Sequence, residues 1–202
     1  MSTSSERNKS LVRAAAAALF LVGLPSAAYA HAVAGDAGGF LHGLAHPVGG
    51  LDHVCAMFAV GLWAAQMNGR AIWLLPLAFV AAMVLGGVLG MSAVALPLAE
   101  PGIILSLLVL GLLIAAAVRL PLSVGAMLAG SFAIFHGYAH GAEMPHAVSA
   151  SAYALGFVLA TAALHASGIF AALTLKALGR AQLLRYSGAG VVLCGVYLGF
   201  AA

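Results

Sequence analysis

Charged side chains are scarce in this sequence of 202 residues, where they make up only 6% of the chain. Soluble domains carry about 25% charged residues. Hydrophobic residues make up 64%, and the mean hydropathy is +1.11. So few charges cannot cover so much apolar surface in water. The composition therefore excludes a soluble globular domain and predicts a polytopic protein whose main partner is the lipid bilayer.

The sequence also has little cysteine and lacks a common nucleotide-binding motif. The two cysteines, Cys55 and Cys194, lie in separate apolar runs, which excludes a disulfide framework and a Cys-rich metal site. The 8 Lys and Arg residues are too few and too scattered to form a nucleic-acid patch. The sequence has no GxxxxGK[ST] loop, so no nucleotide-binding site of that kind is expected. Transport by this chain would depend on a gradient or on a partner subunit.

The first thirty residues have the pattern of a secretory signal peptide. Arg7, Lys9 and Arg13 form a basic start, residues 14–24 form a short apolar run, and residues 28–30 read Ala-Tyr-Ala, a small-x-small cleavage pattern. We therefore predict a signal peptide over 1–30 and a mature domain over 31–202. An uncleaved signal anchor is the alternative.

Six apolar segments follow in the predicted mature chain. A transmembrane helix needs about 20 apolar residues, and segments of roughly this length occupy 47–66, 72–96, 102–118, 122–141, 148–175 and 183–201. The predicted fold class is all-α, a bundle of six transmembrane helices.

The basic residues of this predicted mature chain indicate its orientation. With the N-terminus outside, the first, third and fifth loops face the cytoplasm, and they contain every Lys and Arg after residue 30, namely Arg70, Arg119, Lys176, Arg180 and Arg185. This distribution obeys the positive-inside rule. We expect a multi-pass membrane protein with its N-terminus outside and these three loops in the cytoplasm.

Histidine is abundant for so apolar a chain, with 8 residues. Most of them fall in two clusters that share the pattern His-Gly-x-Ala-His followed by a carboxylate. The first cluster contains His42, His46, Asp52 and His53, and the second contains His136, His140, Glu143 and His146. Ionisable groups at membrane depth usually mark a functional site. Because the first span runs inward and the fourth outward, both clusters are expected in the outer half of the membrane at similar depth.

Helical periodicity suggests how each cluster is arranged. His46 and His53 are seven residues apart, which predicts a shared helical face, and Pro47 suits the first turn of the span. His136, His140 and Glu143 are also predicted to share one face. His165 stands alone in the fifth span and is expected to be a hydrogen-bonded packing residue.

The residue types in the clusters favour a divalent metal ion. Neutral imidazole suits nickel, zinc, copper and iron, and two carboxylates would neutralise a divalent charge. The sequence predicts a metal site between the first and fourth spans, formed by His46, Asp52, His53, His136, His140 and Glu143. The auxiliary or entry ligands are predicted to be His31, Asp36, His42 and His146.

The same motifs resemble those of a known family. His46-x5-Asp52-His53 in the first span, and Phe135-His-Gly-Tyr-Ala-His-Gly-Ala-Glu143 in the fourth, resemble the HupE/UreJ family of bacterial nickel permeases. The resemblance covers the whole predicted mature chain. It implies secondary uptake of Ni²⁺ through these six residues, often to supply hydrogenase or urease. It also implies that the chain is not an enzyme and holds no prosthetic group. Some relatives are assigned to cobalt, so Co²⁺ is the alternative substrate.

Two other classes of function are compatible with histidines in membrane helices. A membrane metalloenzyme would use a bound metal to activate water, and it should keep that metal through purification. Diiron enzymes of this type usually need more histidines, on the cytoplasmic side. A bis-His haem protein for electron transfer would show a visible Soret band. The sequence favours the permease over both.

Overall fold

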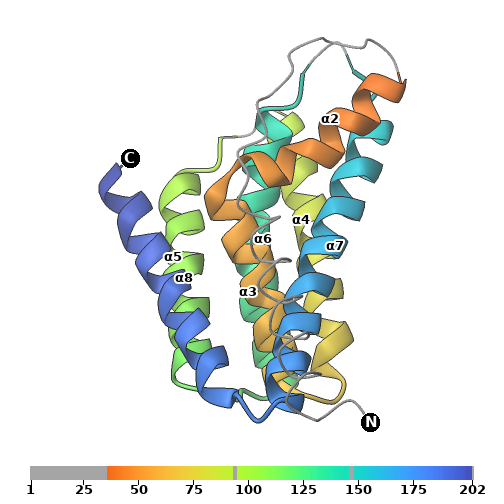
Figure 1. The fold of residues 1–202 in the computed structure, drawn as a ribbon. Coiled ribbons are helices and arrows are strands. Elements are labelled where there is room, and N and C mark those ends of the chain that lie inside the picture. The colour runs from red at the N-terminus through yellow and green to blue at the C-terminus, as the bar shows by residue number, and fades with distance from the viewer. Residues whose placement is uncertain (1–35, 93–94, 146–147, 202) are drawn as a thin grey trace, which may run out of the picture.

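The computed structural model describes residues 36–92, 95–145 and 148–201 (Figure 1). The predicted all-α class is confirmed. The helices within these ranges are α2 (Asp36–Gly49), α3 (Leu51–Met67), α4 (Ala71–Met91), α5 (Ala99–Ala115), α6 (Leu122–Ala142), α7 (Ala150–Ala177) and α8 (Ala181–Ala201). The predicted signal peptide, residues 1–30, lies outside the described residues.

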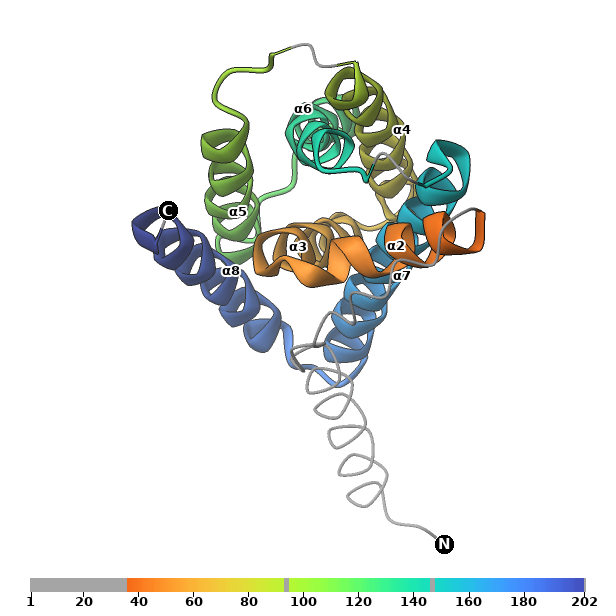
Figure 2. The ribbon, with the colours of Figure 1, turned by 90° about the horizontal axis from the view of Figure 1, so that it is seen from above.

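The helices from α3 to α8 run alternately up and down with short connections (Figure 1). The view from above in Figure 2 places α3 between its neighbours, and α3 contacts α4, α5, α7 and α8. Its side chains are correspondingly well buried, with Trp63, Met57 and Leu62 almost fully enclosed. The core of the bundle is therefore built around α3.

The outer surface of the bundle is apolar. Large side chains such as Leu77, Leu193 and Phe200 are exposed, as expected for helices in contact with lipid rather than water. Four helices, α4, α6, α7 and α8, are long and apolar enough to cross a membrane, and α5 is apolar but has 17 residues. Several apolar helices thus indicate a multi-pass membrane protein. That the chain crosses six times remains a prediction.

The first predicted span differs from the structure. The segment 47–66 was expected to be one continuous helix opening at Pro47. Instead, Pro47 lies inside the end of α2, and α2 and α3 are bent by 83° at the break between them. The break falls at Gly50, whose extended backbone (φ −108°, ψ 126°) interrupts the helix. Two consecutive glycines, Gly49 and Gly50, have high backbone freedom and weaken a helix at this point.

Glycines hold α6 close to α4, the most extensive helix pairing in the bundle. A Cβ atom at Gly137 would collide with the Met83 carbonyl, and one at Gly86 would collide with the Ile134 carbonyl. Small residues allow such close backbone approach between membrane helices. This pairing fixes the position of the α6 segment that carries the second histidine cluster.

The five basic residues of the described ranges lie at or near the connections at the end of the bundle opposite the histidine clusters (Figure 1). The Lys176 ammonium donates to the Ala65 carbonyl (3.1 Å) and to Asn68 Oδ1 (2.5 Å). Arg185 Nε donates to the Ala115 carbonyl (2.7 Å). Cations here satisfy carbonyls at the C-terminal ends of α3 and α5.

Candidate metal site

The two histidine clusters, far apart in sequence, meet at one end of the bundle. The His140 ring centroid lies 4.6 Å from that of His46 and 4.0 Å from that of His53. The His53 ring in turn lies 4.8 Å from the ring of His136. Three helices contribute these side chains, α2, α3 and α6. The imidazoles therefore form one continuous group.

The bend between α2 and α3 changes how the first cluster contributes. His46 and His53 were expected on one helical face, and this expectation is wrong because they lie on different helices at 83° to each other. His46 approaches His140 from α2, and His53 approaches it from the first turn of α3. Both nevertheless reach the same α6 histidine, from two directions rather than one.

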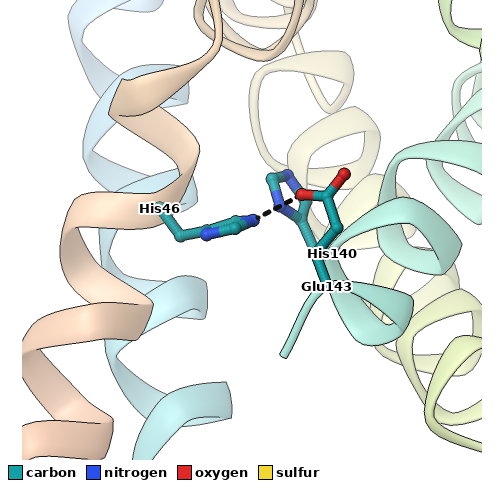
Figure 3. Close-up of side chains that lie close together, drawn as sticks. All are labelled: His46, His140 and Glu143. Atoms are coloured by element: carbon teal, nitrogen blue, oxygen red, sulfur yellow. Dashed lines mark hydrogen bonds and ion pairs between the residues drawn. The ribbon is translucent and has the colours of Figure 1, made fainter. Parts of the chain in front are cut away.

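The outer part of the group consists of His46, His140 and Glu143 (Figure 3). One ligand atom from each residue lies within 4.8 Å of the other two. His46 Nε2 is 3.1 Å from Glu143 Oε2. The Glu143 side chain is 61% exposed and that of His46 is 27% exposed, whereas His140 is buried. A metal ion could therefore reach these residues from outside the bundle. It could be bound there by imidazole nitrogen and carboxylate oxygen together.

The inner part begins with the pair Asp52 and His53. Asp52 Oδ1 accepts a hydrogen bond from His53 Nδ1 at 2.8 Å. His53 Nε2 is buried and has no hydrogen-bond partner among the described residues. A carboxylate that holds the far nitrogen of a histidine fixes its tautomer and aims the other nitrogen at a metal. This geometry makes Asp52 an orienting group for His53.

Ser106 on α5 orients His136 in the same way. Its hydroxyl donates to the Ile103 carbonyl at 2.6 Å. It therefore accepts from His136 Nε2, 2.9 Å away. His136 Nδ1 is left buried without a partner in the described part of the chain. Ser106 is not among the residues predicted from the sequence, although it is the one hydroxyl in the apolar run 102–118.

His140 is the centre of the group. Neither of its ring nitrogens has a hydrogen-bond partner within the described ranges. Its ring packs on Phe157 of α7 at a centroid distance of 4.3 Å. Tyr153, also on α7, donates its hydroxyl hydrogen to the His140 carbonyl at 3.4 Å. The helix α7 thus holds the ring in place and leaves both nitrogens available.

The structure describes only part of the set of four auxiliary ligands predicted from the sequence. His42 is half-buried on α2, one turn before His46, and Asp36 is the first residue of α2. His31 and His146 lie outside the described residues. Their role in capturing metal stays a prediction.

The described donors suit a divalent metal that accepts nitrogen and oxygen. Buried polar groups are normally hydrogen-bonded, so several partnerless ring nitrogens in one place require an explanation such as an ion. Imidazole favours nickel, zinc, copper and iron over calcium and magnesium. Asp52 and Glu143 together would balance the charge of one divalent ion.

The whole chain is similar to proteins of one known family. The family model described as "HupE / UreJ protein" matches residues 19–198. The chain is also similar to "Protein HupE" of Rhizobium leguminosarum bv. viciae, with 45% identity over 181 residues that cover 89% of this chain and 94% of that protein. No solved structure matches the chain.

Proposed function

Because this chain belongs to the HupE/UreJ family, we propose that it is a permease that takes up divalent nickel across the bacterial inner membrane. The transport site is formed by His46, Asp52, His53, His136, His140 and Glu143. The nickel supplies metalloenzymes such as hydrogenase or urease. Nickel is the cargo of this protein, which needs no prosthetic group and performs no catalysis.

One observation supports this proposal above all others. His53 Nε2, His136 Nδ1 and both nitrogens of His140 are buried without partners in the described structure, inside a bundle of apolar helices. Burying unpaired polar groups costs free energy. A cation that passes through the site would give these nitrogens a partner for a short time and so offset that cost. Such transient binding suits transport.

The order of the ligands gives a direction of entry. Metal ions arrive from the periplasm and are attracted by His31, Asp36 and His42. Glu143 is exposed and meets the hydrated ion first, with His46 beside it. The ion then exchanges water for His140, His53 and His136. A movement of α2 and α3 against α6 would open the site inward.

Uptake of trace radioactive nickel tests this function. The assay uses cells that lack their own nickel transporters, with excess cobalt, zinc or magnesium as competitor. We expect saturable uptake that requires Asp52 and His53, and that magnesium leaves unchanged. Stronger competition by cobalt than by unlabelled nickel would make the chain a cobalt permease of the same family. No uptake of either metal by protein present in the membrane would contradict the permease.

The metalloenzyme alternative makes an opposite prediction. An enzyme should retain stoichiometric metal through purification, whereas a permease should exchange it with added chelator. Metal analysis of the purified protein before and after dialysis against a chelator therefore separates the two. A Soret band in the same preparation would instead indicate haem.

A further inference from the structure

His165 of α7 is buried deep in the bundle, away from the six ligands described above. The residue is only 1% exposed. The expectation of a hydrogen-bonded packing residue is not met, because both of its ring nitrogens lack a partner among the described residues. An imidazole without any hydrogen bond is costly in an apolar core. The structure offers no packing reason for keeping nitrogen atoms at this position.

The depth of His165 can be placed along α3. A Cβ atom at Gly61 would collide with the His165 carbonyl, so these two backbones touch. Gly61 follows His53 by eight residues on α3, which corresponds to about 12 Å of helix. His165 therefore lies further inward than the six predicted ligands described above, which we call the outer cluster. It is nearer the end of the bundle that carries the basic residues.

Phe79 of α4 contacts both His136 of the outer cluster and His165. Its ring centroid lies 5.8 Å from that of His136 and 5.1 Å from that of His165. Phe79 is fully buried. An ion that leaves His136 on this route therefore has to pass one aromatic side chain, beyond which His165 supplies the next nitrogen.

Two further donor atoms lie on the same helix faces. Thr161 precedes His165 by one turn of α7, and Met83 follows Phe79 by one turn of α4. The Thr161 hydroxyl donates to Met83 Sδ at 3.7 Å, and both residues are fully buried. The Met83 carbonyl meets Gly137, and Met83 lines a pocket together with His140, so this oxygen and sulfur pair lies between the level of the outer cluster and that of His165.

We propose that His165 is a second, inner binding station for the transported divalent ion, reached from the outer cluster past Phe79, with Thr161 and Met83 as donors between the two. This inference rests on the proposed transport function. It assigns His165 a role in moving the ion inward after capture, whereas the outer cluster selects the ion. Loss of His165 should then slow transport without preventing capture.

A matched pair of variants tests this role, His165→Leu and His165→Met. The two side chains have similar size, and only methionine offers a donor atom. With radioactive nickel as the probe, we expect His165→Leu to lower the maximal uptake rate about 10-fold or more, the size of effect typical for weakened metal sites. The KM of uptake and the affinity of the outer cluster for nickel should change little, whereas the number of nickel ions bound by purified protein at saturation should fall. His165→Met should transport faster than His165→Leu. Ser167→Ala, on the same helix, should transport like the unmodified protein.

The outcomes separate the inner station from the transport function itself. Uptake by His165→Leu equal to that of the unmodified protein would overturn the inner station and leave the permease intact. Equal loss in both folded variants would also overturn it, because the donor atom would then not matter. Absence of uptake by the unmodified protein would instead contradict the proposed function.

A structural measurement covers the case in which both variants fail to fold. Crystals of the unmodified protein soaked in nickel would be examined for anomalous scattering. A peak beside the His165 ring would support the inner station. A peak at the outer cluster with none at His165 would overturn it.

Discussion

His46 on α2 and Glu143 at the end of α6 meet directly, with His46 Nε2 3.1 Å from Glu143 Oε2. This contact joins two motifs that are 97 residues apart in the sequence. It lies at the exposed side of the group, where an incoming ion would first meet protein ligands if the proposed transport site is correct. Its two members should therefore act together in capture.

A double-mutant cycle tests this cooperation. His46→Ala and Glu143→Gln should each raise the KM for nickel uptake, since each removes one ligand from the entry point. The double variant should be little worse than either single variant, because residues that act on one shared interaction are not additive. KM values from the uptake assay, at matched membrane levels, provide the measurement. Strictly additive effects would mean that the two residues act independently.

The Asp52→Asn variant tests whether the negative charge of Asp52, which bonds His53 Nδ1, is needed for transport. Asparagine keeps the shape of the side chain and its oxygen near His53 Nδ1, 2.8 Å away in the present structure. It removes one of the two negative charges that would balance a bound divalent ion in the proposed site. We expect near-total loss of uptake with normal amounts of protein in the membrane, at least about 10-fold. Glu100→Gln, an exposed carboxylate at the start of α5, is the matched control and should leave uptake unchanged. Normal uptake by Asp52→Asn would contradict the site assignment.

Ser106→Ala probes the orientation of His136. The substitution removes the oxygen that His136 Nε2 binds at 2.9 Å, so the ring is free to change tautomer and turn. Loss of such an orienting partner typically weakens a metal site about 10–100-fold. Nickel binding to purified protein should weaken within that range while thermal stability falls only slightly. Ser131→Ala removes a similar hydroxyl, which bonds the Leu128 carbonyl on the exposed side of α6, and should bind nickel normally.

Much of the fold was predictable from the sequence, because length and hydropathy dictate where a chain can form apolar helices. The predicted segment 122–141 and the helix Leu122–Ala142 differ by one residue at the C-terminal end. The spacing of His136, His140 and Glu143 could also be interpreted directly, since three and four residues return a helix to the same face. Such local rules need no knowledge of the partner helices.

The missed features depend on tertiary structure. Periodicity across 47–66 is compatible with one helix. Gly49 and Gly50 weaken that helix locally, but the bend of 83° depends on how α2 packs against α7. The role of Ser106 depends on α5 lying beside α6, which no spacing rule reveals. His165 was interpreted as a packing residue because its isolation is evident in the sequence, whereas its partnerless nitrogens appear only in the packed bundle.

The close pairing of α4 and α6 leads to a prediction about stability. A methyl group at position 137 would collide with the Met83 backbone carbonyl, which cannot rotate away as a side chain can. Overpacking of this kind costs typically about 1–3 kcal/mol. We expect Gly137→Ala to lower the thermal unfolding temperature of the purified protein and to reduce uptake, because α6 carries His136 and His140.

Two further variants separate packing from ligand effects. In Gly86→Ala, the new methyl group would collide with the Ile134 carbonyl across the same pair of helices, and Gly86 is not next to a histidine in the sequence. This variant should lower the unfolding temperature to a similar degree. Gly190→Ala on α8 meets nothing within 4 Å. It should leave uptake unchanged and stabilise the helix slightly, by about 0.5–1 kcal/mol. Unchanged stability in both Gly137→Ala and Gly86→Ala would show that α4 and α6 can separate without cost, and the glycines would then not be what holds the second histidine cluster in place.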